Sequence, residues 1–89
     1  MANHKSAKKR ARQSLKRRAR NRHVRSRVAG VVKTARNAIA SGEVEAASTA
    51  VHAAERTLRK AASKGVISKK QASRRVSRLA KRAHQLSLA

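Results

Sequence analysis

The chain has 89 residues, of which 25 are Lys or Arg and only 3 are Asp or Glu, giving a formal net charge of +22. An excess of this size excludes an ordinary neutral domain and indicates a polyanionic partner: a nucleic acid or, as the second choice, an anionic membrane. The sequence has no Cys, Phe, Tyr or Trp, which excludes disulfides, thiolate metal sites, cysteine nucleophiles and the aromatic platforms that stack single-stranded bases.

The sequence predicts a single all-α domain over residues 1–89. It contains no Pro and 3 Gly, and good helix formers such as Ala, Arg, Lys and Leu dominate it. No apolar run is long enough for a transmembrane helix or a signal peptide. Three segments have apolar residues three and four apart, as in a helix with one buried face. The short links between them favour a three-helix, up-down-up bundle.

The first predicted helix, residues 6–40, has an apolar stripe only in its second half. The stripe consists of Val24, Val28, Val31, Ala35, Ala38 and Ile39. Leu15 is the only large apolar residue between Met1 and Val24. We therefore divide the chain into residues 1–23, a basic extension of the first helix inserted into nucleic acid, and residues 24–89, the bundle. The missing stripe argues against a transit peptide and a membrane-active cationic peptide, because both need an apolar face.

Positive charge surrounds this extension on all sides. Residues 14–27 hold seven Lys or Arg and no acid. Five like-charge pairs spaced four residues apart cost about 1–2.5 kcal/mol in free solution, so we expect residues 1–22 to fray alone and to be helical when bound. A permanently disordered basic tail is the alternative. A helix that is basic all round suits insertion among several phosphate backbones; its cations are Lys5, Lys8, Lys9, Arg10, Arg12, Lys16, Arg17, Arg18, Arg20, Arg22, Arg25 and Arg27.

The second predicted helix, residues 43–62, follows a helix stop at Gly42. Glu43 and Glu45 suit the positive end of its dipole. Its stripe consists of Val44, Ala47, Val51, Ala54, Leu58 and Ala61. Residues 37–63 hold 3 cations and all 3 acids, so the helix is nearly neutral. Glu55 and Arg59, four residues apart, predict an exposed ion pair.

The third predicted helix, residues 68–87, follows a second stop at Gly65, and Ser68 with Gln71 fits a capping box. Its stripe consists of Ala72, Val76, Leu79, Ala83 and Leu86. Residues 64–89 hold 8 cations and no acid. Opposite the stripe, Lys70, Arg74, Arg78 and Lys81 share a side, with Arg75 and Arg82 beside them. We interpret this side as phosphate-binding. The alternative is a solvated face, which usually contains both positive and negative side chains.

Nothing in the sequence predicts catalysis, a metal site or a cofactor. Glu43 and Glu45 are two residues apart and point to different sides of a helix. The four histidines, His4, His23, His52 and His84, have no metal-ligand spacing. There is no glycine loop of the kind that holds phosphate. We therefore predict that the protein is not an enzyme.

Three stretches carry a family resemblance. The residues "MANHKSAKKRARQSLKRR", "AIASGEVEAA" and "KAASKGVISKKQASRRVSRLAKRA" resemble the bacterial small-subunit ribosomal protein twenty family, in the same order and spacing. The family often has other residues at Ser68, Lys70 and Ser73, which affects single contacts. The resemblance implies a three-helix bundle with a long first helix and a cytoplasmic, structural role in the ribosome. It also implies primary binding of 16S ribosomal RNA, at the 5′ domain and the long helix of the 3′ minor domain, during assembly.

The resemblance also implies the partners and the contacts. The protein would be a monomer within the ribosome, would meet other 30S components through RNA, and would have no membrane partner. The implied RNA contacts are Lys5, Ser6, Lys8, Lys9, Arg10, Arg12, Gln13, Ser14, Lys16, Arg17, Arg18, Lys64, Gly65, Lys69, Arg74, Ser77, Arg78 and Lys81. The alternative function is a nucleoid or linker-histone-like protein that compacts DNA, although such proteins usually show Lys/Ala/Pro repeats or a wedge residue.

Overall fold

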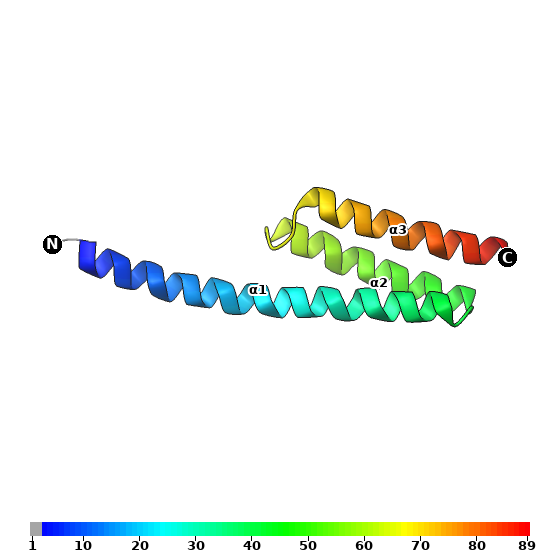
Figure 1. The fold of residues 1–89 in the computed structure, drawn as a ribbon, viewed down its shortest axis with the longest axis horizontal. Coiled ribbons are helices and arrows are strands. Elements are labelled where there is room, and N and C mark those ends of the chain that lie inside the picture. Colours follow the sequence, from blue (N-terminus) through cyan, green and yellow to red (C-terminus); the bar gives the residue numbers. More distant parts are fainter. Residues whose placement is uncertain (1–2) are drawn as a thin grey trace.

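The structure is a computed structural model that describes residues 3–89, and it consists of three helices joined by short turns (Figure 1). Helix α1 spans Asn3–Ala40, α2 spans Val44–Ser63 and α3 spans Lys69–Leu88. No strand occurs in this part of the chain. The predicted all-α, up-down-up arrangement is confirmed. None of the three helices is apolar over a length that would cross a membrane.

The molecule is elongated because α1 is nearly twice as long as the other helices. Its 38 residues extend about 57 Å at 1.5 Å per residue. The Cα atoms span 68 × 20 × 13 Å and have a radius of gyration of 17.8 Å, against about 12 Å for a compact domain of this length. In Figure 1 the N-terminal half of α1 projects alone, and its C-terminal half packs on α2. The projecting first helix that the sequence predicts is therefore present.

The core lies along α2, which contacts both other helices, whereas α1 and α3 contact each other much less. Its buried residues are small or medium-sized: Val28, Val32, Ala35, Val51, Ala54, Leu58, Ala61, Ala72 and Leu79. Leu58 is 0 % exposed and is the largest fully buried side chain. No polar or charged residue among those described is buried. The core is therefore entirely apolar.

The predicted stripes are largely correct, with three differences. Val32 and Val66 are buried although neither belongs to a predicted stripe, and Val44 is 45 % exposed although it was assigned to one. Val32 is covered because α3 approaches α1 from the side, beside the face that packs on α2. Val44 is the first residue of α2, so no preceding turn of its own helix covers it.

The two glycine stops have the backbone conformation that the sequence predicts. Gly42 and Gly65 have φ of 81° and 77°, in the left-handed region that glycine adopts without a steric cost. At Gly65 the amides of Gly65 and Val66 donate to the carbonyls of Ala62 and Ala61, each over 3.0 Å. This pair of hydrogen bonds is a Schellman motif at the C-terminal end of α2. It turns the Val66 side chain inward and accounts for its burial.

Both later helices begin one residue after the predicted position, because Glu43 and Ser68 are caps with extended backbones, at ψ 109° and 152°. The Gln71 amide donates to Ser68 Oγ over 3.1 Å, so the main hydrogen bond of the predicted capping box is confirmed. Glu43 makes no side-chain capping bond, and Glu45 lies in the first turn of α2.

Replacing Ser68 with alanine is expected to lower the free energy of unfolding by about 1 kcal/mol, because the Gln71 amide loses its acceptor. Urea titration followed by circular dichroism at 222 nm measures the change. Ser73→Ala is the matched control, since Ser73 is exposed inside α3 and alanine is the better helix former. Equal midpoints for Ser68→Ala and the unaltered chain would show that the cap contributes nothing.

Candidate nucleic-acid interface

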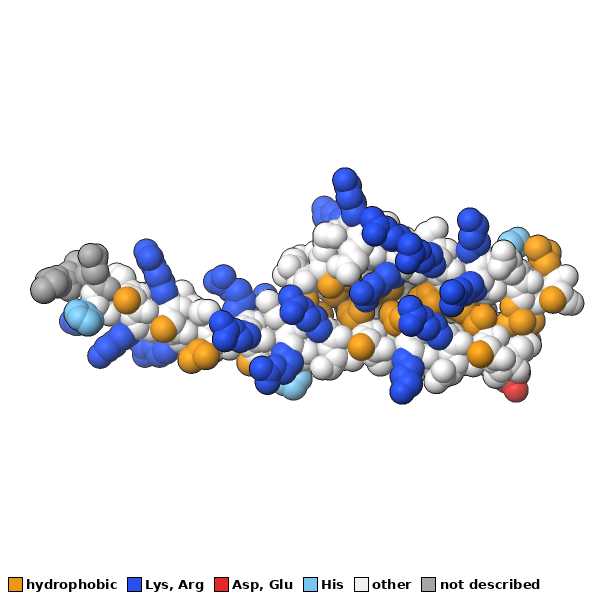
Figure 2. All heavy atoms as spheres, in the orientation of Figure 1, with side chains coloured by type: hydrophobic (Ala, Val, Ile, Leu, Met, Phe, Trp, Pro, Cys, Tyr) orange, Lys and Arg blue, Asp and Glu red, His pale blue; other side chains and the backbone are white. Residues whose placement is uncertain are grey.

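The projecting half of α1 is fully open to solvent. Every described side chain from His4 to Arg20 is exposed. In Figure 2, Lys and Arg side chains stand on both edges of this half, and others gather over the bundle, where apolar atoms show between them. The extension therefore presents cations in several directions at once, as the sequence predicts.

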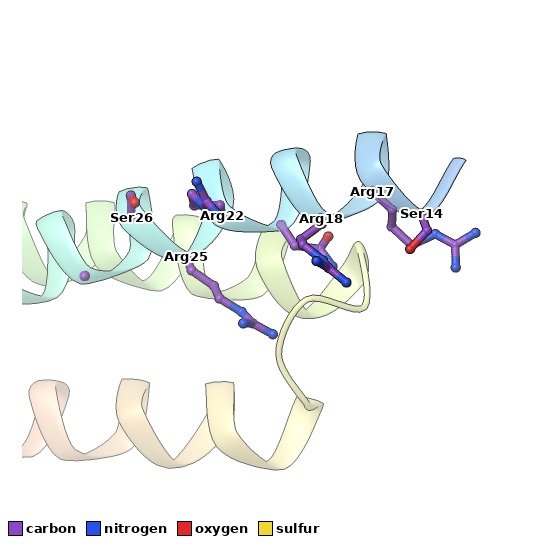
Figure 3. Close-up of a pocket in the computed structure, with 8 residues that line it drawn as sticks. Ser14, Arg17, Arg18, Arg22, Arg25 and Ser26 are labelled. Atoms are coloured by element: carbon purple, nitrogen blue, oxygen red, sulfur yellow. The ribbon is translucent and has the colours of Figure 1, made fainter. Parts of the chain in front are cut away.

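The first concave part of the surface, which we call the arginine channel, runs along α1 where the projecting half joins the bundle. Its volume is about 620 Å³. It is lined by Ser14, Arg17, Arg18, Asn21, Arg22, Arg25, Ser26 and Ala29. Figure 3 shows Arg18 and Arg25 extending from α1 on the side where α3 and the α2–α3 turn lie. Four guanidinium groups thus line one channel with small hydroxyl and amide side chains between them.

The second part, the α1–α3 groove, continues from the arginine channel, because Ala29 lines both. It has a volume of about 600 Å³ and is lined by Ala29, Val32, Lys33, Arg36, Asn37, Arg75, Arg78, Leu79 and Arg82. Val32 and Leu79 are buried core residues. The groove therefore has an apolar floor between two rows of cations, one from α1 and one from α3.

No acid lines the channel or the groove. Glu55, on α2, accepts from Arg59 Nη2 over 2.7 Å, with His52 Nδ1 at 3.9 Å, which confirms the predicted ion pair. Glu43 and Glu45 are exposed at the N-terminal end of α2. Nine cations therefore line the channel and groove, and no carboxylate of residues 3–89 lines either of them. Phosphate groups are the ligands that relieve this repulsion.

One acceptor in the arginine channel has no hydrogen-bond partner. Asn21 Oδ1 is shut off from solvent and accepts no hydrogen bond from the residues that the structure describes. A buried acceptor in this state loses its interaction with water without compensation. Because this oxygen is not exposed, a donor group of a nucleic acid cannot reach it in the conformation described.

The structure divides the predicted RNA-binding residues among several places. The channel holds Ser14, Arg17, Arg18, Arg22 and Arg25, and the groove holds Arg75, Arg78 and Arg82. Outside both, on exposed parts of α1, lie Lys5, Ser6, Lys8, Lys9, Arg10, Arg12, Gln13, Lys16 and Arg20. Lys70, Arg74 and Lys81 are exposed on α3 but do not line the groove. The side of α3 predicted as one phosphate-binding face is therefore split in two.

The remaining predicted residues lie around α2. Lys69 and Ser77 line a depression of about 600 Å³ between α2 and α3. Gly65 is in the turn, and Arg27 and Lys64 line a pocket between α1 and α2. Sequence reasoning missed Lys33, Arg36 and Asn37 in the groove, together with Arg56 and Lys60 in that pocket. Helical spacing could have identified Arg36, because it lies 18 residues after Arg18, which is about five complete turns.

The basic extension is helical in the structure from Asn3 onward, and its like-charge pairs are exposed. We expect the amides of residues 5–18 to exchange hydrogen rapidly in the free protein and at least ten times more slowly when RNA is bound, because phosphate offsets about 1–2.5 kcal/mol of repulsion. Mass spectrometry of deuterium uptake measures this, with residues 51–58 as the internal control. Equal protection of both segments in the free protein would contradict the expectation.

The histidines and acids are not grouped for metal binding: within residues 3–89, no three His, Asp or Glu side chains come together.

The sequence is similar to those of known ribosomal proteins. Residues 2–84 match the family described as "Ribosomal protein S20". The chain is 53 % identical over 87 residues to the small ribosomal subunit protein bS20 of Nitratidesulfovibrio vulgaris, covering 98 % of this chain and 100 % of the relative. It is 55 % identical over 89 residues to bS20 of Anaeromyxobacter sp. strain Fw109-5, covering 100 % and 99 %. It is 52 % identical over 81 residues to bS20 of Campylobacter fetus, covering 91 % and 92 %.

Proposed function

Since this chain belongs to the ribosomal protein S20 family, we propose that it is a structural component of the bacterial small ribosomal subunit that binds 16S ribosomal RNA. It works in the cytoplasm, within the ribosome, as a single copy that meets other 30S components through RNA. The 5′ domain and the long helix of the 3′ minor domain are the RNA partners. It holds a folded arrangement of RNA in place during assembly.

The observation that supports this proposal best is the continuity of the arginine channel with the α1–α3 groove. A backbone that follows α1 from the extension into the bundle meets cations along the whole path. Contacts to phosphate position a nucleic acid without reading its bases, which fits a protein without aromatic residues.

The candidate contacts follow from this path. Arg17, Arg18, Arg22 and Arg25 bind the backbone in the channel, and Lys33, Arg36, Arg75, Arg78 and Arg82 bind it in the groove. The exposed cations of residues 5–16 and the outer cations of α3 bind neighbouring strands. No step of this function needs bond-making chemistry, a metal or a cofactor, and we infer that the protein is not an enzyme.

Binding to 16S 5′-domain RNA and to duplex DNA of equal length, over a salt series, tests the proposal. With six to nine phosphate contacts, the affinity for either partner falls by about 10³–10⁵ between 50 and 200 mM salt. We expect the RNA to keep a large advantage at the highest salt, because its folded shape and its 2′-hydroxyls are recognised. Coincident curves would instead indicate a DNA-compacting protein or a general binder of polyanions.

A further inference from the structure

One end of the bundle lacks the positive charge that covers the rest of the chain. Residues 37–55, which end α1 and begin α2, and residues 83–89, which include the end of α3, contain no Lys or Arg, so all 25 lie elsewhere. The end of α1, the start of α2 and the end of α3 lie together, opposite the basic extension (Figure 1). We call this region the cation-free end. It includes Glu43 and Glu45, two of the three acids.

The helix termini add to the negative character of this end. Helices α1 and α3 both finish here, and neither has a basic residue in its last turn. The C-terminal end of a helix carries about half a negative charge, which Lys or Arg in the last turn commonly offsets. Helix α2 ends at the other end of the bundle and has such cations, Lys60 in its last turn and Lys64 as its cap. The cation-free end therefore attracts cations from outside the chain.

Apolar side chains are exposed at the same end. Residues 3–89 have three exposed large apolar residues, and two of them, Val44 at 45 % and Leu88 at 74 %, belong to the cation-free end. Leu86 is half-buried and lies outside the core cluster. Figure 2 shows apolar side chains at the right-hand end of the bundle, and the Lys and Arg side chains of this face stop short of it. Single exposed apolar residues are ordinary, whereas a group of them rimmed by polar residues indicates a contact surface.

The charge of this end limits what can cover it. Glu43 and Glu45 form no ion pair with any cation of residues 3–89, so they repel the phosphates of a nucleic acid or of an anionic membrane. A second copy of the chain docked end to end would place the same two carboxylates against each other. A protein segment that carries Lys or Arg around apolar side chains complements both the charge and the apolar residues.

We propose that the cation-free end binds a basic segment of another protein of the small ribosomal subunit. Lys and Arg of that segment pair with Glu43 and Glu45 and with the C-terminal ends of α1 and α3, and its apolar side chains cover Val44 and Leu88. The inference rests on the proposed function and adds one direct protein contact to a chain that otherwise meets other components through RNA. The chain is then held by RNA along its basic length and by protein at its tip.

Photo-crosslinking in reconstituted subunits tests this contact. Because the sequence has no cysteine, a single introduced cysteine carries one benzophenone group. Val44→Cys and Leu88→Cys place this group at the cation-free end, and Ser26→Cys places it in the arginine channel. Each full-length variant is assembled with 16S ribosomal RNA and the purified proteins of the small subunit and is then irradiated. We expect Val44→Cys and Leu88→Cys to attach to the same basic protein, and Ser26→Cys to attach to RNA.

The outcomes separate this inference from the proposed function. If Ser26→Cys attaches to RNA while both end positions attach only to RNA, to a second copy or to nothing, the inference is wrong and the proposed function stands. Attachment of the end positions to an acidic protein would overturn the inference as well. A failure of Ser26→Cys to attach to RNA would overturn the proposed function, and this inference with it.

Substitution of carboxylates tests the charge complementarity separately. Glu43→Gln/Glu45→Gln removes both carboxylates of the cation-free end, and Glu55→Gln is the control because Glu55 is already paired with Arg59 over 2.7 Å. In Leu88→Cys we expect the double substitution to lower attachment to protein about five-fold, as for the loss of two exposed ion pairs, and Glu55→Gln less than about two-fold. Neither should change the affinity for 16S RNA alone more than about two-fold, since no acid lines the channel or groove. Equal attachment would overturn the choice of a basic partner.

Discussion

Replacing Leu58 with alanine is expected to lower the free energy of unfolding by about 2–5 kcal/mol and to leave the free chain largely unfolded. Leu58 is 0 % exposed and is the largest fully buried side chain. The core cluster to which it belongs consists mainly of Ala and Val, whose short side chains cannot move far enough to fill the space that a leucine leaves. A chain of 89 residues starts with little stability to lose.

The control for Leu58→Ala is the same substitution at Leu15, which is 64 % exposed on the projecting half of α1. Leu15→Ala should change the free energy of unfolding by less than about 0.5 kcal/mol. Thermal melts followed by circular dichroism compare the two. Adding 16S RNA should restore helix to Leu58→Ala, since a ligand that binds only the folded state stabilises it by mass action. Similar melting of the two variants would show that Leu58 does not anchor the core.

Removing three arginines of the channel together, as Arg18→Gln/Arg22→Gln/Arg25→Gln, is expected to weaken RNA binding on the order of 100-fold at 0.15 M salt. Each lost phosphate contact leaves one more counterion on the RNA and costs about five-fold at this salt. The slope of log affinity against log salt should therefore become shallower by about three. Affinity measured by filter binding at four or more salt concentrations gives both quantities.

The slope of log affinity against log salt distinguishes a loss of phosphate contacts from a loss of folding. A variant that merely folds less well would bind more weakly at every salt concentration with an unchanged slope, and that result would contradict phosphate contacts in the channel. Arg59→Gln is the control for loss of charge, because Arg59 is already paired with Glu55. It should weaken binding less than two-fold.

The local signals in the sequence predicted the fold well. Gly42, Gly65 and the Ser68 cap end and begin the helices within one residue of the predicted positions, because each acts through the backbone of its own turn. The Glu55–Arg59 ion pair was predictable for the same reason, because its two residues lie four apart in one helix. The burial of Val32 and Val66 was not predictable in the same way, because it depends on how α3 and the α2–α3 turn lie against their neighbours.

The candidate interface was harder to predict for a related reason. Counting charge by segment made residues 37–63 look neutral, although Arg56 and Lys60 lie at the other end of α2 from Glu43 and Glu45. The groove requires two helices, so the periodicity of α3 alone could not separate Arg75, Arg78 and Arg82, which line it, from Lys70, Arg74 and Lys81, which do not. Sequence patterns identify the charged helices, and only their packing shows which cations line the same groove.

The position of Glu43 and Glu45 has a consequence for how the free chain approaches RNA. The two acids lie at the α1–α2 turn, at the opposite end of a 68 Å molecule from the basic extension (Figure 1). This separation makes the chain a permanent electric dipole, and the field of a polyanion exerts a torque that turns the extension forward before contact. The encounter is thereby oriented, so the two acids act on the association rate constant rather than on the final affinity.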